Sequence, residues 1–464
     1  MSVGRFSLDS SYRRPNNGRV VIAGSPLRLF TLSEAGRHVV AAIERGDTPP
    51  QPHQRLTDRL LDAGALHPQL AAFGDRPEVG SLSPSLTIVV PAFNQLPTFR
   101  PTVCRTIVVD DASSCPLTAQ PDEPAAALIE LHRLAVNVGP GGARNAGLAL
   151  VHTEFVAFID TDVDIDETAL APLLAHFDDP RVALVAPRIR PAQAAGCLAA
   201  YERRHSPLDR GVEPGRIAPT TRVSFVPAAV IVCRTAAVRD IGGFDASLRF
   251  GEDVDLVWRL VAAGHRCRYE PSVVAGHQVR PTMGSWWRQR VGYGSSAAPL
   301  ARRHPGALAP FRMSGWSAAG WASVAAGFPV AGMAIGAGTA VALARKLRSI
   351  PVTESLRLAG LGNLHAGRLV ASAITRAWWP IAFALAVCSR RARRAVALAV
   401  LVPALIDWHQ QRPELHPARY VALRVLDDAA YGAGLWQGAW RQRSVAALLP
   451  SFEPWPPRRN ATNP

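Results

Sequence analysis

The sequence predicts an α/β protein built on a mostly parallel sheet with helices on both faces. From about Ser85 to Pro281, short apolar runs rich in β-branched residues alternate with segments of helical periodicity, which is typical of such a sheet. Polar residues directly follow several of these runs, and ligands bind beyond the carboxyl ends of parallel strands. A small α+β unit precedes this region and an apolar helical tail follows it. The expected divisions are therefore residues 1–80, 85–281 and 282–464.

The first division has the pattern of a strand-turn-strand followed by two helices. Val20–Ile22 and Leu27–Thr31 are short strand candidates, and Ser33 is placed to cap a helix with apolar residues at helical spacing. A second helix is expected over Leu56–Ala63. A unit of this size is too small to house catalysis and suits binding a partner. The alternative is a subdomain that only packs on the rest of the chain.

The second division contains five strand candidates, three of which end in polar clusters. Because the carboxyl ends of parallel strands meet at one edge of a sheet, we expect the polar clusters to converge on one crevice. The strands are Leu86–Val90, Thr106–Val109, Phe155–Ile159, Ala183–Ala186 and Val230–Cys233. The residues expected to line this crevice are Pro91, Asn94, Asp110, Asp111, Asp160 and Asp162.

Three carboxylates, Asp160, Asp162 and Asp164, occupy alternate positions after the Phe155–Ile159 strand. In extended backbone they point the same way and concentrate negative charge. Oxygen ligands of this kind favour Mg²⁺ or Mn²⁺ together with a diphosphate. The alternative is a solvated acidic turn.

Two further segments carry candidate site residues. The small residues of Asn137–Asn145 precede a helix start, where Arg144 is placed to pair with an anion, although a tight turn explains the glycines equally well. Glu252 and Asp253 begin a helix that Gly264 ends, either as capping acids or with one of them as a general base. His277 is a further candidate metal ligand, and Asp110 or Asp111 is a candidate acceptor for a uracil N–H.

Taken in order, Pro-Ala-Phe-Asn, Val-Asp-Asp-Ala-Ser, Asn-Val-Gly-x-x-x-Ala-Arg-Asn-x-Gly, Asp-Thr-Asp and Gly-Glu-Asp resemble the inverting family 2 glycosyltransferases with a GT-A fold. The resemblance covers about Ser85 to His277. It implies that Asp162 is the direct metal ligand, with Asp160 nearer the ribose and His277 completing the site. It also implies Asp253 as the base and Glu252 as the second choice. The Gln-x-x-Arg-Trp motif of processive members is absent, so processivity is not predicted.

The layout of the whole chain narrows this resemblance. Residues 18–66 resemble the winged-helix-like peptide-recognition domains of ribosomal-peptide maturation systems, and with the segment 293–306 the chain is similar to the mycofactocin-system glycosyltransferases. That resemblance implies transfer of a hexose, glucose from UDP-glucose, onto the peptide-derived redox cofactor mycofactocin, building a short oligosaccharide. One alternative is a membrane glycosyltransferase with a lipid-linked or polysaccharide acceptor. A second alternative is an inactive peptide-binding scaffold.

Charge and the apolar tail bear on partners and location. The chain has 464 residues with 51 Lys plus Arg against 36 Asp plus Glu, and since almost all cations are Arg, phosphorylated molecules and anionic membranes are favoured over nucleic acid. Met313–Ala344 is uncharged and long enough to span a bilayer. Ala377–Ser389 and Ala395–Ile406 are shorter apolar runs around an Arg cluster at 390–394. No signal peptide is recognisable. These features predict association with the cytoplasmic face of the membrane, with a soluble cytoplasmic protein as the alternative.

Overall fold

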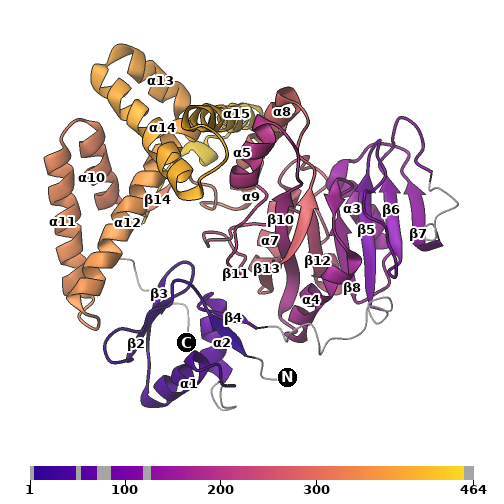
Figure 1. Ribbon diagram of the computed structural model, residues 1–464, viewed down its shortest axis with the longest axis horizontal. Coiled ribbons are helices and arrows are strands. Elements are labelled where there is room, and N and C mark those ends of the chain that lie inside the picture. The colour runs from indigo at the N-terminus through magenta and orange to yellow at the C-terminus, as the bar shows by residue number, and fades with distance from the viewer. Residues whose placement is uncertain (1–4, 49–53, 70–84, 119–126, 454–464) are drawn as a thin grey trace. The chain divides into compact units, whose positions relative to one another are not determined.

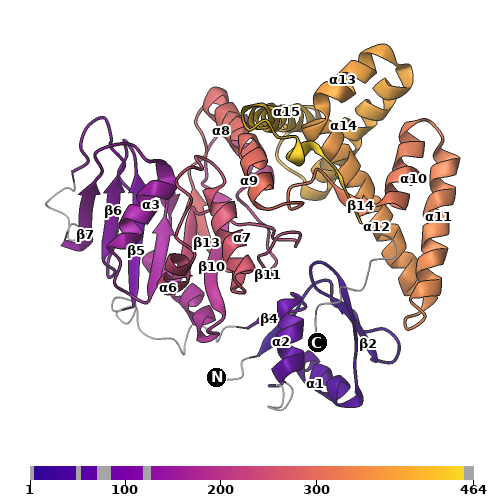
Figure 2. The same cartoon turned by 180° about the vertical axis from the view of Figure 1, so that it is seen from behind.

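The computed structural model describes residues 5–48, 54–69, 85–118 and 127–453. The chain forms two compact units, one made of Met1–Ala194 with His205–Val279 and the other of Ala195–Arg204 with Arg280–Pro464 (Figures 1 and 2). The expected boundary near residue 80 lies outside the described residues.

The N-terminal part of the first unit has the predicted hairpin and two helices. The hydroxyl of Ser33 accepts a hydrogen bond from the Gly36 N–H, as expected of a helix cap. One antiparallel strand pair, β1 with β4, was not expected from the sequence. The elements are β1 (Phe6–Leu8), β2 (Val20–Ala23), β3 (Arg28–Thr31), α1 (Glu34–Glu44), α2 (Gln54–Asp62) and β4 (Leu66–Pro68).

Among its described residues, the remainder of the first unit is built on a nine-stranded sheet in the order β11-β13-β10-β12-β8-β5-β6-β7, with β9 paired to β13. All five predicted strands are confirmed. The sheet is mixed, because β12 runs antiparallel to both of its neighbours, β8 and β10. The strands are β5 (Leu86–Ala92), β6 (Thr106–Asp110), β7 (Ile129–Arg133), β8 (Phe155–Ile159), β9 (Val163–Asp164), β10 (Val182–Pro191), β11 (Gly215–Arg216), β12 (Val230–Arg234) and β13 (Arg266–His277).

Successive side chains of β5 point to opposite faces of the sheet, and helices cover both of these faces, as predicted. Ile88 and Val90 belong to a buried cluster with Leu170 and Leu173. On the other face a Cβ added at Gly147 of α3 would lie 2.3 Å from a methyl of Val89, so only glycine allows this approach. The helices are α3 (Gly139–Ala149), α4 (Ala171–Leu174), α6 (Thr235–Asp240) and α7 (Glu252–Ala262), with short 3₁₀ turns at Glu167–Leu170 and Ala175–Asp178.

The second unit, as far as Glu453 where its description ends, is helical apart from the short parallel pair β14 (Arg312–Ser314) and β15 (Ser451–Glu453). Its core includes a buried ion-pair network in which Arg290 contacts both Glu202 and Asp427. The helices are α5 (Cys197–His205), α8 (Met283–Ser295), α9 (Ala297–Arg303), α10 (Gly315–Ala325), α11 (Pro329–Lys346), α12 (Val352–Ser372), α13 (Trp379–Cys388), α14 (Arg390–Gln411) and α15 (Pro417–Arg441).

The uncharged run Met313–Ala344, expected as one long helix, is instead divided between α10 and α11. Gly327 at φ +92° and Pro329 interrupt it, since neither residue sustains a helix interior. Within the described ranges, no individual helix has both the length and the apolar character needed to cross a bilayer. By length and composition alone, one pair bent by 91° does meet that test, Val352–Ala377 with Trp379–Cys388.

Candidate active site

The Asp-Thr-Asp motif follows β8 at the carboxyl end of the strand, where the sequence predicted it. The Asp160 N–H donates to the carbonyl oxygen of Ala229 at 2.9 Å, which fixes the motif against the start of β12. The chain then turns into β9, which pairs with the end of β13. This pairing brings Asp162 beside His277, although 115 residues of sequence separate them.

Arg144 joins this motif to the start of α7. Its Nη2 lies 2.6 Å from Asp160 Oδ1 and its Nη1 lies 2.8 Å from Glu252 Oε1. Burial disfavours the charged guanidinium, but the two carboxylates outweigh burial and raise the pKa of Arg144. The anions that Arg144 pairs with are therefore two carboxylates of the site itself. Among the described residues, its buried Nε has no hydrogen-bond partner.

Glu252 and Asp253 open α7, after Gly251 at φ +81°. Asp253 Oδ1 accepts the Val254 N–H at 2.7 Å, and Oδ2 accepts the Ala228 N–H at 3.3 Å. Burial, followed by the neighbouring charge of Glu252, raises the pKa of Asp253 to about 7. A carboxylate with this pKa titrates near neutral pH, which suits a general base.

Asp110 and Asp111, the candidate uracil-binding residues, are buried and already hold the loops around them. Arg133 donates to Asp110 at 2.6 Å. Burial raises the pKa of Asp110, but this contact and the hydrogen bonds from Ser113 and Leu117 outweigh it and hold the pKa below its usual range. Asp111 accepts the backbone N–H groups of Val138 and Gly139 at 2.7 and 2.9 Å. Each carboxylate oxygen has two lone pairs, so these contacts leave acceptor capacity for a ligand.

The predicted Pro91-Ala92-Phe93-Asn94 segment lies next to this loop. Asn94 has φ +58°, and its side-chain oxygen accepts the Ser114 N–H at 2.8 Å. Pro91 is still within β5, where it pairs with Val109.

The glycine-rich segment Asn137–Asn145 is hydrogen-bonded to the segment before α7, because the Asn145 side chain both donates to and accepts from the backbone of Phe244. A Cβ added at Gly243 would lie 2.4 Å from the Asn145 oxygen, so a larger residue there would displace this contact.

The candidate metal ligands are partly assembled. His277 Nε2 lies 3.4 Å from Asp162 Oδ1, whereas Asp160 is paired with Arg144. Over the described ranges, no group of three or more His, Cys, Asp or Glu side chains is arranged to hold a metal ion. Two protein ligands do fit Mg²⁺ or Mn²⁺, because such ions at phosphate-transfer sites take one or two protein ligands and complete their coordination with phosphate oxygens and water.

Several contacts of the site were not foreseen from the sequence. The links from Arg144 to Glu252, from Ala228 to Asp253 and from Arg133 to Asp110 join residues far apart in the chain. No local signal marks such pairs, because charge and periodicity constrain only near neighbours.

The profile described as "Glycosyl transferase family 2" matches residues 87–236, which include the Asp-Thr-Asp motif and most of the sheet. The α/β sheet with acidic motifs at its strand ends and this match together define the class of protein as a family 2 glycosyltransferase, an enzyme.

Two curated proteins of Mycobacterium tuberculosis strains, both named "Pre-mycofactocin glycosyltransferase", are 39% identical to the chain over 463 residues, covering 96% of it and 97% of each relative. The "Poly-beta-1,6-N-acetyl-D-glucosamine synthase" of Staphylococcus aureus is 27% identical over 162 residues, 34% of this chain and 38% of that protein. A similar solved structure is "Mannosyltransferase PcManGT from Pyrobaculum calidifontis in complex with GDP-Man and Mn2+", with 15% identity and a TM-score of 0.42, covering 84% of this chain and 94% of that chain. With its near-complete match to the mycobacterial relatives, the chain belongs to the pre-mycofactocin glycosyltransferase family.

Proposed function

We propose that the chain transfers glucose from UDP-glucose, with inversion at the anomeric carbon, to a pre-mycofactocin acceptor and builds a short oligosaccharide. One observation carries the proposal: Arg144 contacts both Asp160 and Glu252, so the Asp-Thr-Asp motif and the start of α7, which carries the candidate base Asp253, belong to one site. The name of the mycobacterial relatives supports the acceptor. The motif resemblance to inverting family members supports the stereochemistry.

In the proposed reaction, Asp253 takes the proton of an acceptor hydroxyl. The hydroxyl oxygen forms a bond to the anomeric carbon as the bond to the diphosphate oxygen breaks, and the electron pair leaves with the diphosphate. A pKa of about 7 keeps a large fraction of Asp253 ionised at neutral pH while it remains basic enough to accept a proton. Glu252, paired with Arg144, adds negative charge beside Asp253 and raises its basicity.

Asp162 and His277 are the residues proposed to hold Mg²⁺ or Mn²⁺, with Asp160 close to the donor ribose. When bound, the ion stabilises the charge that develops on the leaving diphosphate. Asp110, Asp111, Asn94 and Pro91 are proposed to line the donor base pocket.

The test is mass spectrometry of a reaction that contains the protein, UDP-glucose, Mg²⁺ or Mn²⁺ and the peptide-derived acceptor. A series of hexose additions that disappears when a chelator is added would support the proposed donor, the proposed acceptor and the need for a metal ion together. Release of UDP without modification of the peptide-derived compound would contradict the proposed identity of the acceptor. It would favour a lipid-linked or polysaccharide acceptor. No UDP release in any combination would overturn the proposed activity and favour a peptide-binding scaffold.

We also propose that the second unit contacts an anionic membrane surface at the cytoplasmic face. Large apolar side chains are exposed along α13 and α14, and four arginines lie at the start of α14. An apolar surface beside a cationic cluster suits the boundary between lipid headgroups and acyl chains. The apolar residues are Ile381, Phe383, Leu385, Val387, Leu398, Leu401, Val402 and Leu405, and the arginines are Arg390, Arg391, Arg393 and Arg394.

Co-sedimentation with vesicles tests this contact. Binding to vesicles that contain anionic lipid, which weakens with salt and with the paired change Phe383→Ser and Leu385→Ser, is expected. A matched change of two exposed apolar residues elsewhere, Leu131→Ser and Val136→Ser on and near β7, should leave binding unchanged. Concentration-dependent dimerisation without vesicle binding would instead show that a second copy of the chain covers the surface.

A further inference from the structure

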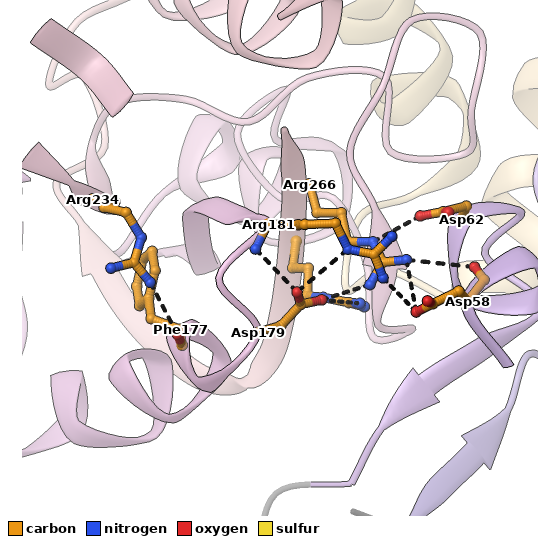
Figure 3. A network of polar contacts seen from close by, with 8 residues as sticks. Asp58, Asp62, Phe177, Asp179, Arg181, Arg234 and Arg266 are labelled. Atoms are coloured by element: carbon orange, nitrogen blue, oxygen red, sulfur yellow. Dashed lines mark hydrogen bonds and ion pairs between the residues drawn. The ribbon is translucent and has the colours of Figure 1, made fainter. Parts of the chain in front are cut away.

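Charged side chains of the sheet domain (residues 85–279) contact the N-terminal part of the first unit (residues 5–69) at one edge of the sheet. Arg266, at the start of β13, contacts Asp62 of α2 at 2.7 Å and Asp179 at 2.6 Å (Figure 3). Arg266 also lies 3.3 Å from Asp58 of the same helix, and Arg181 forms a further ion pair with Asp58. The Arg266 side chain is buried and Asp179 is largely buried, whereas Asp62 is about half exposed, so solvent screens the contact with Asp179 less than the contact with Asp62.

Arg222 makes a separate contact with the N-terminal part. Its Nη2 lies 2.9 Å from Asp9 Oδ2, and its backbone N–H donates to Ser25 Oγ at 2.6 Å. Asp9 is buried and also contacts His67 at 2.9 Å. Burial raises the pKa of Asp9, but hydrogen bonds from His67, Ser11 and Arg222 outweigh it and hold the pKa well below its usual range. Asp9 is therefore ionised, and Arg222 is held by a buried negative charge.

The segment that follows Arg222 is bonded twice to α7, the helix that carries the candidate base. The carbonyl oxygen of Ser224 accepts the Trp258 Nε1–H at 2.7 Å. Four residues further on, the Ala228 N–H donates to Asp253 Oδ2 at 3.3 Å. The seven residues Arg222–Ala228 thus connect the N-terminal part to the base and to its helix.

We propose that Arg222 is a positioning residue for the transfer reaction, and that the segment Arg222–Ala228 transmits the placement of the N-terminal part to the candidate base Asp253. This inference rests on the proposed function, in which Asp253 accepts the acceptor proton. A peptide-derived acceptor held by the N-terminal part would act on the same segment, so acceptor recognition and proton abstraction are linked.

The groups that face Asp253 determine what loss of this connection does. Glu252 disfavours ionisation of Asp253, whereas Arg144 and the N–H groups of Val254 and Ala228 favour it. Once Arg222 releases the segment, the Ala228 hydrogen bond lengthens and the pKa of Asp253 rises further. A rise of about 0.5–1 unit from a starting value of about 7 lowers the ionised fraction at pH 7 about two- to fivefold.

The experiment compares the full-length wild type with Arg222→Ala, Arg222→Lys and Ser25→Ala. In Arg222→Ala, the acidic limb of the pH profile of kcat/KM should lie at a pH about 0.5–1 unit higher than in the wild type. Arg222→Lys keeps a cation near Asp9, so the acidic limb of its profile should lie between those of Arg222→Ala and the wild type. Ser25→Ala removes only the acceptor of the Arg222 N–H, so it keeps the proposal testable if Arg222→Ala does not fold.

Arg181→Ala is the matched control, because Arg181 also binds the N-terminal part, through Asp58, but lies outside the segment. Its profile should equal that of the wild type. Wild-type profiles in Arg222→Ala and Ser25→Ala would overturn the inference. If Asp253→Asn retains transfer, the base assignment of the proposed function fails instead, and the two failures are thereby distinguished.

Discussion

Replacing Arg144 with Met removes the cation between two carboxylates and leaves the rest of the site in place. The Glu252 side chain is 9% exposed and Asp160 is 30% exposed, and each forms a short charge-assisted contact with Arg144. Water can solvate Asp160 after the substitution, so most of the cost falls on Glu252. Removing one partner of a buried ion pair costs about 3–5 kcal/mol, and the partial exposure of Asp160 places this case near the lower end.

Denaturant unfolding at pH 8 measures this cost, and a double-mutant cycle assigns it. Arg144→Met should lower the free energy of unfolding by about 3 kcal/mol. Adding Glu252→Gln should recover a large part of the loss, because the glutamine leaves no buried charge without a partner. A matched change at an exposed pair, Arg105→Met opposite Glu130, should cost no more than about 1 kcal/mol. Equal losses for Arg144→Met and Arg105→Met would refute the reasoning.

Three further variants test the site and the domain contact. Asp253→Asn should abolish transfer while calorimetry shows donor binding largely intact, and wild-type turnover would contradict its role as base. Because the pKa of Asp253 in the folded chain lies above that in the unfolded chain, the folded state loses stability as pH rises through about 7. At pH 8 the same variant, which cannot ionise, should therefore have a larger free energy of unfolding than the wild type, by up to about 4 kcal/mol. Asp162→Ala should weaken metal-dependent UDP binding at least tenfold by titration calorimetry, and unchanged binding would move the metal site elsewhere. Asp9→Asn should destabilise the protein at pH 7 more than at pH 3, since a carboxylate with a depressed pKa loses its stabilising contribution as pH falls, and equal losses at both pH values would argue against a paired Asp9.

The local sequence pattern was sufficient to predict the positions of the strands and the order of the motifs along the chain. The predicted strand Phe155–Ile159 is reproduced without change, and the helix that begins at Glu252 ends before Gly264 as expected. Strand alternation, capping residues and glycine at helix ends act within a few residues, so the sequence shows them directly. The uncharged run Met313–Ala344 shows the limit of composition, because one glycine and one proline divide it into two helices.

The sequence by itself determined the α/β class, the polar clusters at three strand ends, two of which are acidic, and the family to which the chain belongs. Only the tertiary structure decided which charges meet. Arg144 joins Asp160 to Glu252, and Arg222 reaches Asp9 across more than two hundred residues. Pairings over such separations depend on how the strands and helices pack in three dimensions, and no periodicity along the chain encodes them. Burial, which raises the pKa of Asp253 to about 7, likewise exists only once α7 has packed against the sheet.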